Sequence, residues 1–116
     1  MISSLNIESV KHNLRKHRAV NREINAAFQY YLRNAGLQRA QAFRREIMQA
    51  IEHIEGFPYG CPPHIRNTRK WKMQTFPYFF FFRNTPQGPY VLAFAHAARK
   101  PGYWLERLQP EESHDP

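Results

Sequence analysis

The residues best suited to chemistry gather in one short segment near the end of the chain. They are His96, Arg99, Lys100, Tyr103 and Trp104. Imidazole titrates closest to neutral pH, so His96 could transfer protons, although a lone histidine ending a strand is more typically a structural hydrogen-bonding residue. Arg99 and Lys100 could bind an acidic partner segment or the target, or could be a solvated pair. Tyr103 and Trp104 could stack a base or anchor a partner, or could close one end of the core.

Five more cations precede this segment and widen the choice of anion-binding residues: Arg66, Arg69, Lys70, Lys72 and Arg83. Arg69, Lys70 and Lys72 alternate partly along a predicted strand, where phosphate binding and a solvated edge are both open interpretations. Arg83 ends a predicted strand at a turn. Between Gly56 and Leu105 there are seven positive residues and no acidic residue. The second half of the chain is therefore predicted to carry a basic surface.

Several common catalytic signatures are missing. The sequence has no Walker loop, no HExxH motif, no GxSxG elbow and no paired Cys/His metal spacing. Cys61 is the single cysteine, which excludes an internal disulfide and a thiolate metal site. We therefore expect no metal and no cofactor, and we assign no role to Cys61.

Length and composition predict one folded domain. The chain has 116 residues, of which 42% are hydrophobic and 15% are aromatic, too many core-forming residues for a disordered chain. The net charge of +8 and the pI near 10.1 make a polyanion or an acidic protein the expected class of partner. The sequence shows no secretory signal and no apolar run approaching about 18 residues, so we expect a cytoplasmic protein that does not engage a membrane.

The two ends of the chain differ in charge and regularity from the part between them. Residues 1–20 form an atypical basic segment, in which residues 9–20 could be a polar edge strand or an extension of the first helix. The other end is acidic, with a single arginine, Arg107, facing Glu106, Glu111, Glu112 and Asp115. We expect one domain over residues 1–108 and a flexible acidic tail over residues 109–116. The tail is either solvated or lies back weakly over the basic surface.

Hydrophobic periodicity predicts two helices that form a hairpin. Residues 21–35 carry a stripe at three- and four-residue spacing, and residues 38–55 carry a second one. Asn21 is the expected N-cap of the first helix, and Gly36 is expected to end it. So short a connection predicts two antiparallel neighbours.

The remainder predicts strands over residues 65–75, 77–83 and 90–96, with turn residues between the last two. The run Phe79 to Phe82 supplies apolar side chains to both faces, so the middle strand is predicted to be central and covered on both sides. The helices would cover one face. The small side chains of Ala93 and Ala95 would let a helix approach closely.

The order of several motifs resembles a known family. They are Glu23-Ile24, Ala27 and Tyr30-Tyr31; Phe57-Pro58 with Gly60; Phe76-Pro77-Tyr78; and His96, Arg99, Pro101, Tyr103-Trp104 and Arg107. From about residue 21 to residue 108 the chain resembles toxins of the RelE/ParE superfamily, from the plasmid-stabilisation branch of bacterial type II toxin–antitoxin systems. Two features depart from the family pattern. A basic stretch over residues 11–20 replaces the usual apolar first strand, and the tail past Leu108 is additional.

The resemblance implies an α+β fold, in which an N-terminal two-helix hairpin packs on a small antiparallel β-sheet. It also implies a cognate antitoxin that wraps the toxin in a hetero-oligomer. RelE-like members cut mRNA on the ribosome, whereas ParE-like members inhibit DNA gyrase without being hydrolases. The His-x-x-Arg-x-Pro-x-Tyr-Trp ending is closer to the ParE side, which implies a growth-inhibiting toxin that binds DNA gyrase. The alternative is a RelE-like ribosome-dependent endoribonuclease, and a third option is a non-toxic member that binds only nucleic acid or its antitoxin.

Each activity implies its own residues. Metal-independent RNA cleavage by 2′-OH attack needs groups that accept and donate protons, and cations that stabilise the phosphorane. Under this alternative the catalytic candidates are His96, Arg83 and Tyr103. The candidates for binding a partner or nucleic acid are Arg66, Arg69, Lys70, Lys72, Arg99, Lys100 and Trp104.

Overall fold

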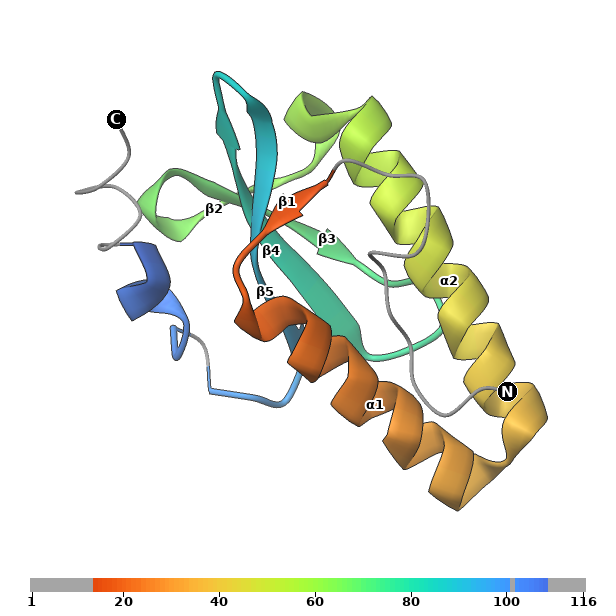
Figure 1. The fold of residues 1–116 in the computed structure, drawn as a ribbon. Helices are drawn as coiled ribbons and strands as arrows, with labels where there is room; N and C mark the ends of the chain where they lie inside the picture. The colour runs from red at the N-terminus through yellow and green to blue at the C-terminus, as the bar shows by residue number, and fades with distance from the viewer. Residues whose placement is uncertain (1–13, 101, 109–116) are drawn as a thin grey trace.

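A computed structural model describes residues 14–100 and 102–108 (Figure 1). In chain order the regular elements are β1 (Arg15–Lys16), α1 (Ala19–Ala35), α2 (Leu37–Gly56), β2 (Pro63–His64), β3 (Thr68–Lys72), β4 (Tyr78–Thr85) and β5 (Gly88–His96). The described residues also include three short 3-10 helices: η2 (Pro58–Gly60), η3 (Ile65–Asn67) and η4 (Leu105–Arg107). The acidic tail predicted at 109–116 and residues 1–13 of the basic segment lie outside the described residues.

The helical hairpin is confirmed, and its first helix begins earlier than predicted. Ala19 and Val20 are buried, so apolar burial begins two residues before the predicted start. The N-cap residue is Arg18, and Asn21 lies inside the helix, so the prediction that Asn21 caps it is wrong. The His17 Nδ1 atom instead accepts the Ala19 N–H at 3.1 Å and satisfies one donor of the first turn. Gly36, with φ of +93°, separates α1 from α2, which diverge from this point in Figure 1.

The five described strands form one sheet in the order β1-β5-β4-β3-β2. Neighbouring strands are antiparallel, as predicted, except that the short β1 pairs in parallel with β5. The sheet is therefore mixed, because the chain leaves β1 through both helices before β5 returns beside it. Within the described part of that stretch, residues 14–20, both predicted alternatives occur: the two-residue edge strand β1 and the first two residues of α1. The strand predicted over 65–75 is shorter, since Ile65–Asn67 forms η3 and β3 ends at Lys72.

The central strand is covered on both faces, as its aromatic run predicts. Phe80 and Phe82 are fully buried in the cluster beneath the helices, with Phe28 and Phe43. Phe81 points to the opposite face. There Ala93 and Ala95 pack against the C-terminal segment around Trp104 rather than against a helix, so the expectation that they receive a helix is wrong. Their small size gives room for the indole ring instead.

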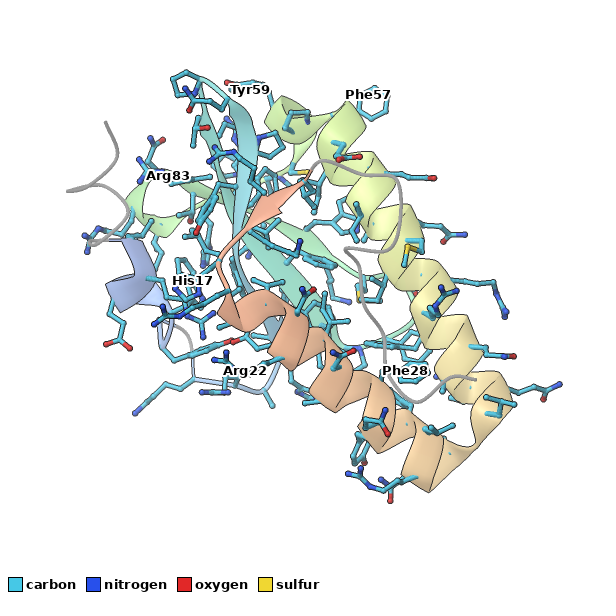
Figure 2. The ribbon with its side chains drawn as sticks, viewed as in Figure 1. His17, Arg22, Phe28, Phe57, Tyr59 and Arg83 are labelled. Carbon is cyan, nitrogen blue, oxygen red and sulfur yellow. The ribbon has the colours of Figure 1, made fainter. Side chains whose placement is uncertain are left out.

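A buried carboxylate fixes the loop between β3 and β4. Glu46 of α2 accepts hydrogen bonds from the backbone N–H groups of Gln74 and Thr75. These hydrogen bonds hold the loop against α2. In the same loop, the Phe76 ring lies beneath the Arg39 guanidinium, whose central carbon is 4.4 Å from the ring centroid. At the other end of α2, Phe57 and Tyr59 project outward (Figure 2). Across the described part of the chain, no helix has the length and apolar character that a membrane crossing needs.

Candidate functional site

A cavity of about 160 Å³ opens on the sheet face opposite the helices. Its apolar floor is formed by Phe79 and Phe81 of β4 with Trp104. Positive side chains stand around the floor, and two histidines complete the wall: Lys70, Arg99, Lys100, His64 and His96. We call this cavity the cationic pocket. It brings six of the residues predicted from the sequence into one place: Lys70, His96, Arg99, Lys100, Tyr103 and Trp104.

Trp104 forms part of the core rather than an open stacking platform. Its side chain is 1% exposed, and its ring stacks on that of Phe81 with the centroids 4.9 Å apart and the planes inclined by 28°. The His64 ring packs near both, 5.2 Å from Phe81. Burial and the positive charge of Lys70 lower the pKa of His64. Base stacking needs an exposed ring face, so the geometry favours the interpretation in which Trp104 closes the end of the core.

A second, more open hollow of about 300 Å³ adjoins the cationic pocket. It lies between α1 and the end of β5, with Tyr30, Tyr78 and Phe94 in its lining. Ala95, His96, Arg99 and Tyr103 line both hollows. These four residues form a shared wall, so one extended ligand could occupy both sides of it.

A glutamate of α1 holds this wall in place. Glu23 accepts hydrogen bonds from the Phe94 N–H at 3.0 Å, from the Tyr103 hydroxyl at 2.9 Å and from Arg107 Nη2 at 2.7 Å. Arg107 also donates from Nη1 to the Leu92 carbonyl oxygen at 2.8 Å. The Glu23–Arg107 ion pair thus satisfies two backbone groups on the edge of β5, in the place of a neighbouring strand. In the sequence, Glu23 and Arg107 stand out only as positions of the family motifs, and no local pattern marks them as an ion pair.

Tyr103 is positioned by charges on several sides. The Arg99 guanidinium lies 3.8 Å from its ring centroid and that of Arg107 lies 5.1 Å away. Burial, followed by the charge and hydrogen bond of Glu23, raises the pKa of Tyr103 to about 12. At neutral pH the hydroxyl is protonated and donates a hydrogen bond to Glu23, so it is poorly suited to act as a general base.

This environment predicts a loss of stability in alkaline solution. Because the pKa of Tyr103 rises from 10.0 to about 12 on folding, its contribution is complete below pH 10 and is lost as the pH rises through 12. Chemical unfolding between pH 9.5 and 12 should show this decline, and Tyr103→Phe should make it shallower. Equal slopes in the two proteins would contradict the assigned environment. The pKa of Tyr78 is also raised to about 12, mainly by burial, so part of the decline should remain in the variant.

His96 reaches the pocket with one ring nitrogen already engaged. Its Nδ1 atom accepts the Ala98 N–H at 2.9 Å, and its ring packs edge to face on Tyr78. With Nδ1 as the acceptor, the neutral ring carries its proton on Nε2. In this arrangement His96 offers a donor rather than a base.

Arg83 does not join the other two catalytic candidates. His96 pairs with Tyr78 at one end of the β4–β5 ladder, whereas Arg83 (labelled in Figure 2) pairs with Tyr90 near the hairpin. The five-residue separation along β4 corresponds to about 16 Å. The structure therefore brings His96 and Tyr103 together and places Arg83 outside the pocket.

Strand alternation divides the predicted binding cations. Arg69 donates from Nη1 to the carbonyl oxygens of Tyr59 and Cys61 at 2.9 and 2.7 Å, so it ties β3 to the preceding loop. Lys70, on the opposite face, lines the pocket. Lys72 is exposed at the end of β3, and Arg66 lies in η3 with φ of +56°. Of these four cations, only Lys70 lies at the cationic pocket.

The described residues include no group of three His, Cys, Asp or Glu side chains that could hold a metal ion. Cys61 is buried, its thiol donates weakly to the Phe57 carbonyl oxygen, and burial raises its pKa. Neither observation gives this residue a chemical role.

Comparison with known proteins identifies the fold. No family model and no curated protein sequence matches the chain. Among solved structures, it is similar to a chain from the chromosomal ParDE TA (toxin–antitoxin) system of P. aeruginosa, with a TM-score of 0.63 and 15% sequence identity. The match covers 72% of this chain and 92% of the other. The two chains therefore share a fold: a helical hairpin packed on one face of a small sheet.

Proposed function

We propose that this chain is the toxin of a bacterial type II toxin–antitoxin system, a ParE-like growth inhibitor that binds DNA gyrase and is neutralised by a cognate antitoxin. The fold shared with the ParDE chain and the motif order described above support the toxin assignment. The observation that carries the choice of mechanism is the separation of Arg83 from His96 and Tyr103. A nuclease would need these groups around one phosphate.

The alternative is a RelE-like ribosome-dependent endoribonuclease. One observation favours it, namely that Lys70, Arg99 and Lys100 surround a cavity that also contains His96. Cations so placed could stabilise a phosphorane. However, the Tyr103 hydroxyl is engaged with Glu23, and the Nδ1 atom of His96 already accepts the Ala98 N–H. Binding without hydrolysis is the function that this geometry supports best.

Induced expression in a bacterial host separates the two mechanisms. We expect DNA synthesis to fall within minutes while an abundant mRNA remains intact by primer extension. Purified protein should also inhibit supercoiling by gyrase. Early loss of translation, with new cuts inside codons and unaffected supercoiling, would overturn the proposal in favour of the nuclease.

Two substitutions sharpen this test. Arg83→Gln and His96→Gln should leave growth arrest intact if the chain acts by binding gyrase. If His96 were a general acid or base, its loss would reduce cleavage by about 100-fold or more and relieve the arrest. Circular dichroism of both purified variants provides the control for folding.

A further inference from the structure

The cationic pocket has the size of one apolar side chain. An apolar protein cavity of roughly 150 Å³ holds one benzene molecule, and the pocket measures about 160 Å³. Its floor is apolar, with the buried side chains of Phe81, Ala95 and Trp104 beneath it. One leucine or phenylalanine side chain would fill it, whereas a nucleotide with its sugar would not fit inside.

Positive side chains reach the pocket from two separate segments of the chain. Lys70 comes from β3, and Arg99 and Lys100 come from the segment after β5. None of the described residues that line the pocket is acidic. Glu23, which lines the adjoining hollow, is paired with Arg107. Carboxylates on either side of an inserted apolar side chain would therefore meet cations.

The faces of the aromatic rings are already covered. Lys70 Nζ lies 5.5 Å from the ring centroid of Phe79, and the Arg99 guanidinium lies 3.8 Å from that of Tyr103. Phe81 packs against Trp104 and His64. Single-stranded nucleic acids bind largely by stacking bases on free ring faces. The pocket offers cationic groups instead, and these suit a carboxylate-bearing peptide.

From these three observations we propose that the cationic pocket binds one bulky apolar side chain of an acidic peptide, whose flanking carboxylates pair with Lys70, Arg99 and Lys100. The adjoining hollow behind His96 and Tyr103 would take a second apolar side chain of the same segment. The inference rests on the proposed function only in taking this peptide to be a segment of the antitoxin.

Binding of designed peptides to the full-length protein tests the proposal. The probe is a fluorescein-labelled 12-residue peptide of glutamates with one central phenylalanine, measured by fluorescence anisotropy. Replacing the phenylalanine with alanine should weaken binding by about tenfold, because the buried apolar area is lost. A single-stranded oligothymidylate of the same length should bind more weakly than the phenylalanine peptide. Equal affinities for the two peptides would overturn the proposal.

Matched variants assign the binding to the pocket. Lys70→Gln should weaken binding of the phenylalanine peptide by about tenfold. Lys72→Gln makes the same charge change on the same strand but outside the pocket. The affinity of this variant for the peptide should stay within about twofold of that of the unsubstituted protein. Ala97→Phe should block the mouth, because exposed Ala97 lines it, whereas Ala98→Phe, at an exposed neighbour that does not line it, should not. Equal effects within either pair would mean diffuse charge attraction and would overturn the proposal.

The remaining outcomes are also decisive. The oligothymidylate could instead bind more tightly than the peptide, with this binding abolished by Lys70→Gln and by Ala97→Phe. That result would overturn the proposal and show that the pocket is a nucleic-acid site. A chain that arrests growth and inhibits gyrase without binding the peptide would refute the inference alone. A chain that binds the peptide through the pocket without arresting growth would refute the proposed function alone.

Discussion

Replacing Glu23 with alanine is expected to lower the free energy of unfolding by about 3 kcal/mol. The carboxylate is 19% exposed and its ion-pair partner Arg107 is 15% exposed, so water can replace the lost bonds only in part. The variant removes the acceptor from the Phe94 N–H and the Tyr103 hydroxyl, and it leaves the Arg107 charge without its partner. Urea unfolding followed by circular dichroism measures the effect.

Two further variants isolate the cause. Glu52→Ala, an exposed glutamate of α2, makes the same charge change and should alter stability by no more than about 0.5 kcal/mol. Arg107→Lys keeps the positive charge but lacks the planar fork that reaches both Glu23 and the Leu92 carbonyl. It should therefore lose part of the stability. A Glu23→Ala protein as stable as the Glu52→Ala protein would show that the network contributes little.

Replacing Trp104 with alanine is expected to cost about 4 kcal/mol, at the level of other buried Trp-to-Ala changes. The ring is 1% exposed and stacks on Phe81, and with Leu108 it covers the sheet face opposite the helices. Its loss would open a cavity under the C-terminal segment. Thermal or urea unfolding gives the loss directly.

Trp104→Phe distinguishes packing from recognition. A phenyl ring can still stack on Phe81, so this variant should lose clearly less stability and retain partner binding. If Trp104→Ala were instead as stable as the parent chain while binding of the acidic peptide disappeared, the residue would be a binding residue, as the sequence analysis allowed.

The parts of the fold that depend on neighbouring residues could be predicted from the sequence. Helical periodicity gave the hairpin to within two residues, because each stripe packs on the same core. The run of aromatic residues in β4 predicted a strand buried on both faces, since alternate side chains point to opposite sides. The start of α1 was missed because a histidine, rather than a typical capping residue, accepts its first N–H.

The site was harder to predict, for two different reasons. Strand alternation separates Arg69 from Lys70, and hairpin register separates Arg83 from His96, so the sequence contains the information that divides these residues. The Glu23 network is different, since its partners lie 71 to 84 residues further along the chain. No local pattern marks such a pairing, and Glu46, 28 residues from Gln74, was missed for the same reason.

The long reach of Glu23 also bears on how the newly made chain folds. The α1–α2 hairpin can pack from local contacts as soon as it is synthesised, and such contacts form quickly. The parallel pairing of Arg15 with Tyr90 and the closure of the β5 edge by residues 23 and 107 must wait until nearly the whole described domain exists. At about 5 to 20 residues per second, translation leaves several seconds between these two stages. During that interval the apolar underside of the hairpin has no sheet to cover it, so we expect the emerging chain to be a client for chaperones.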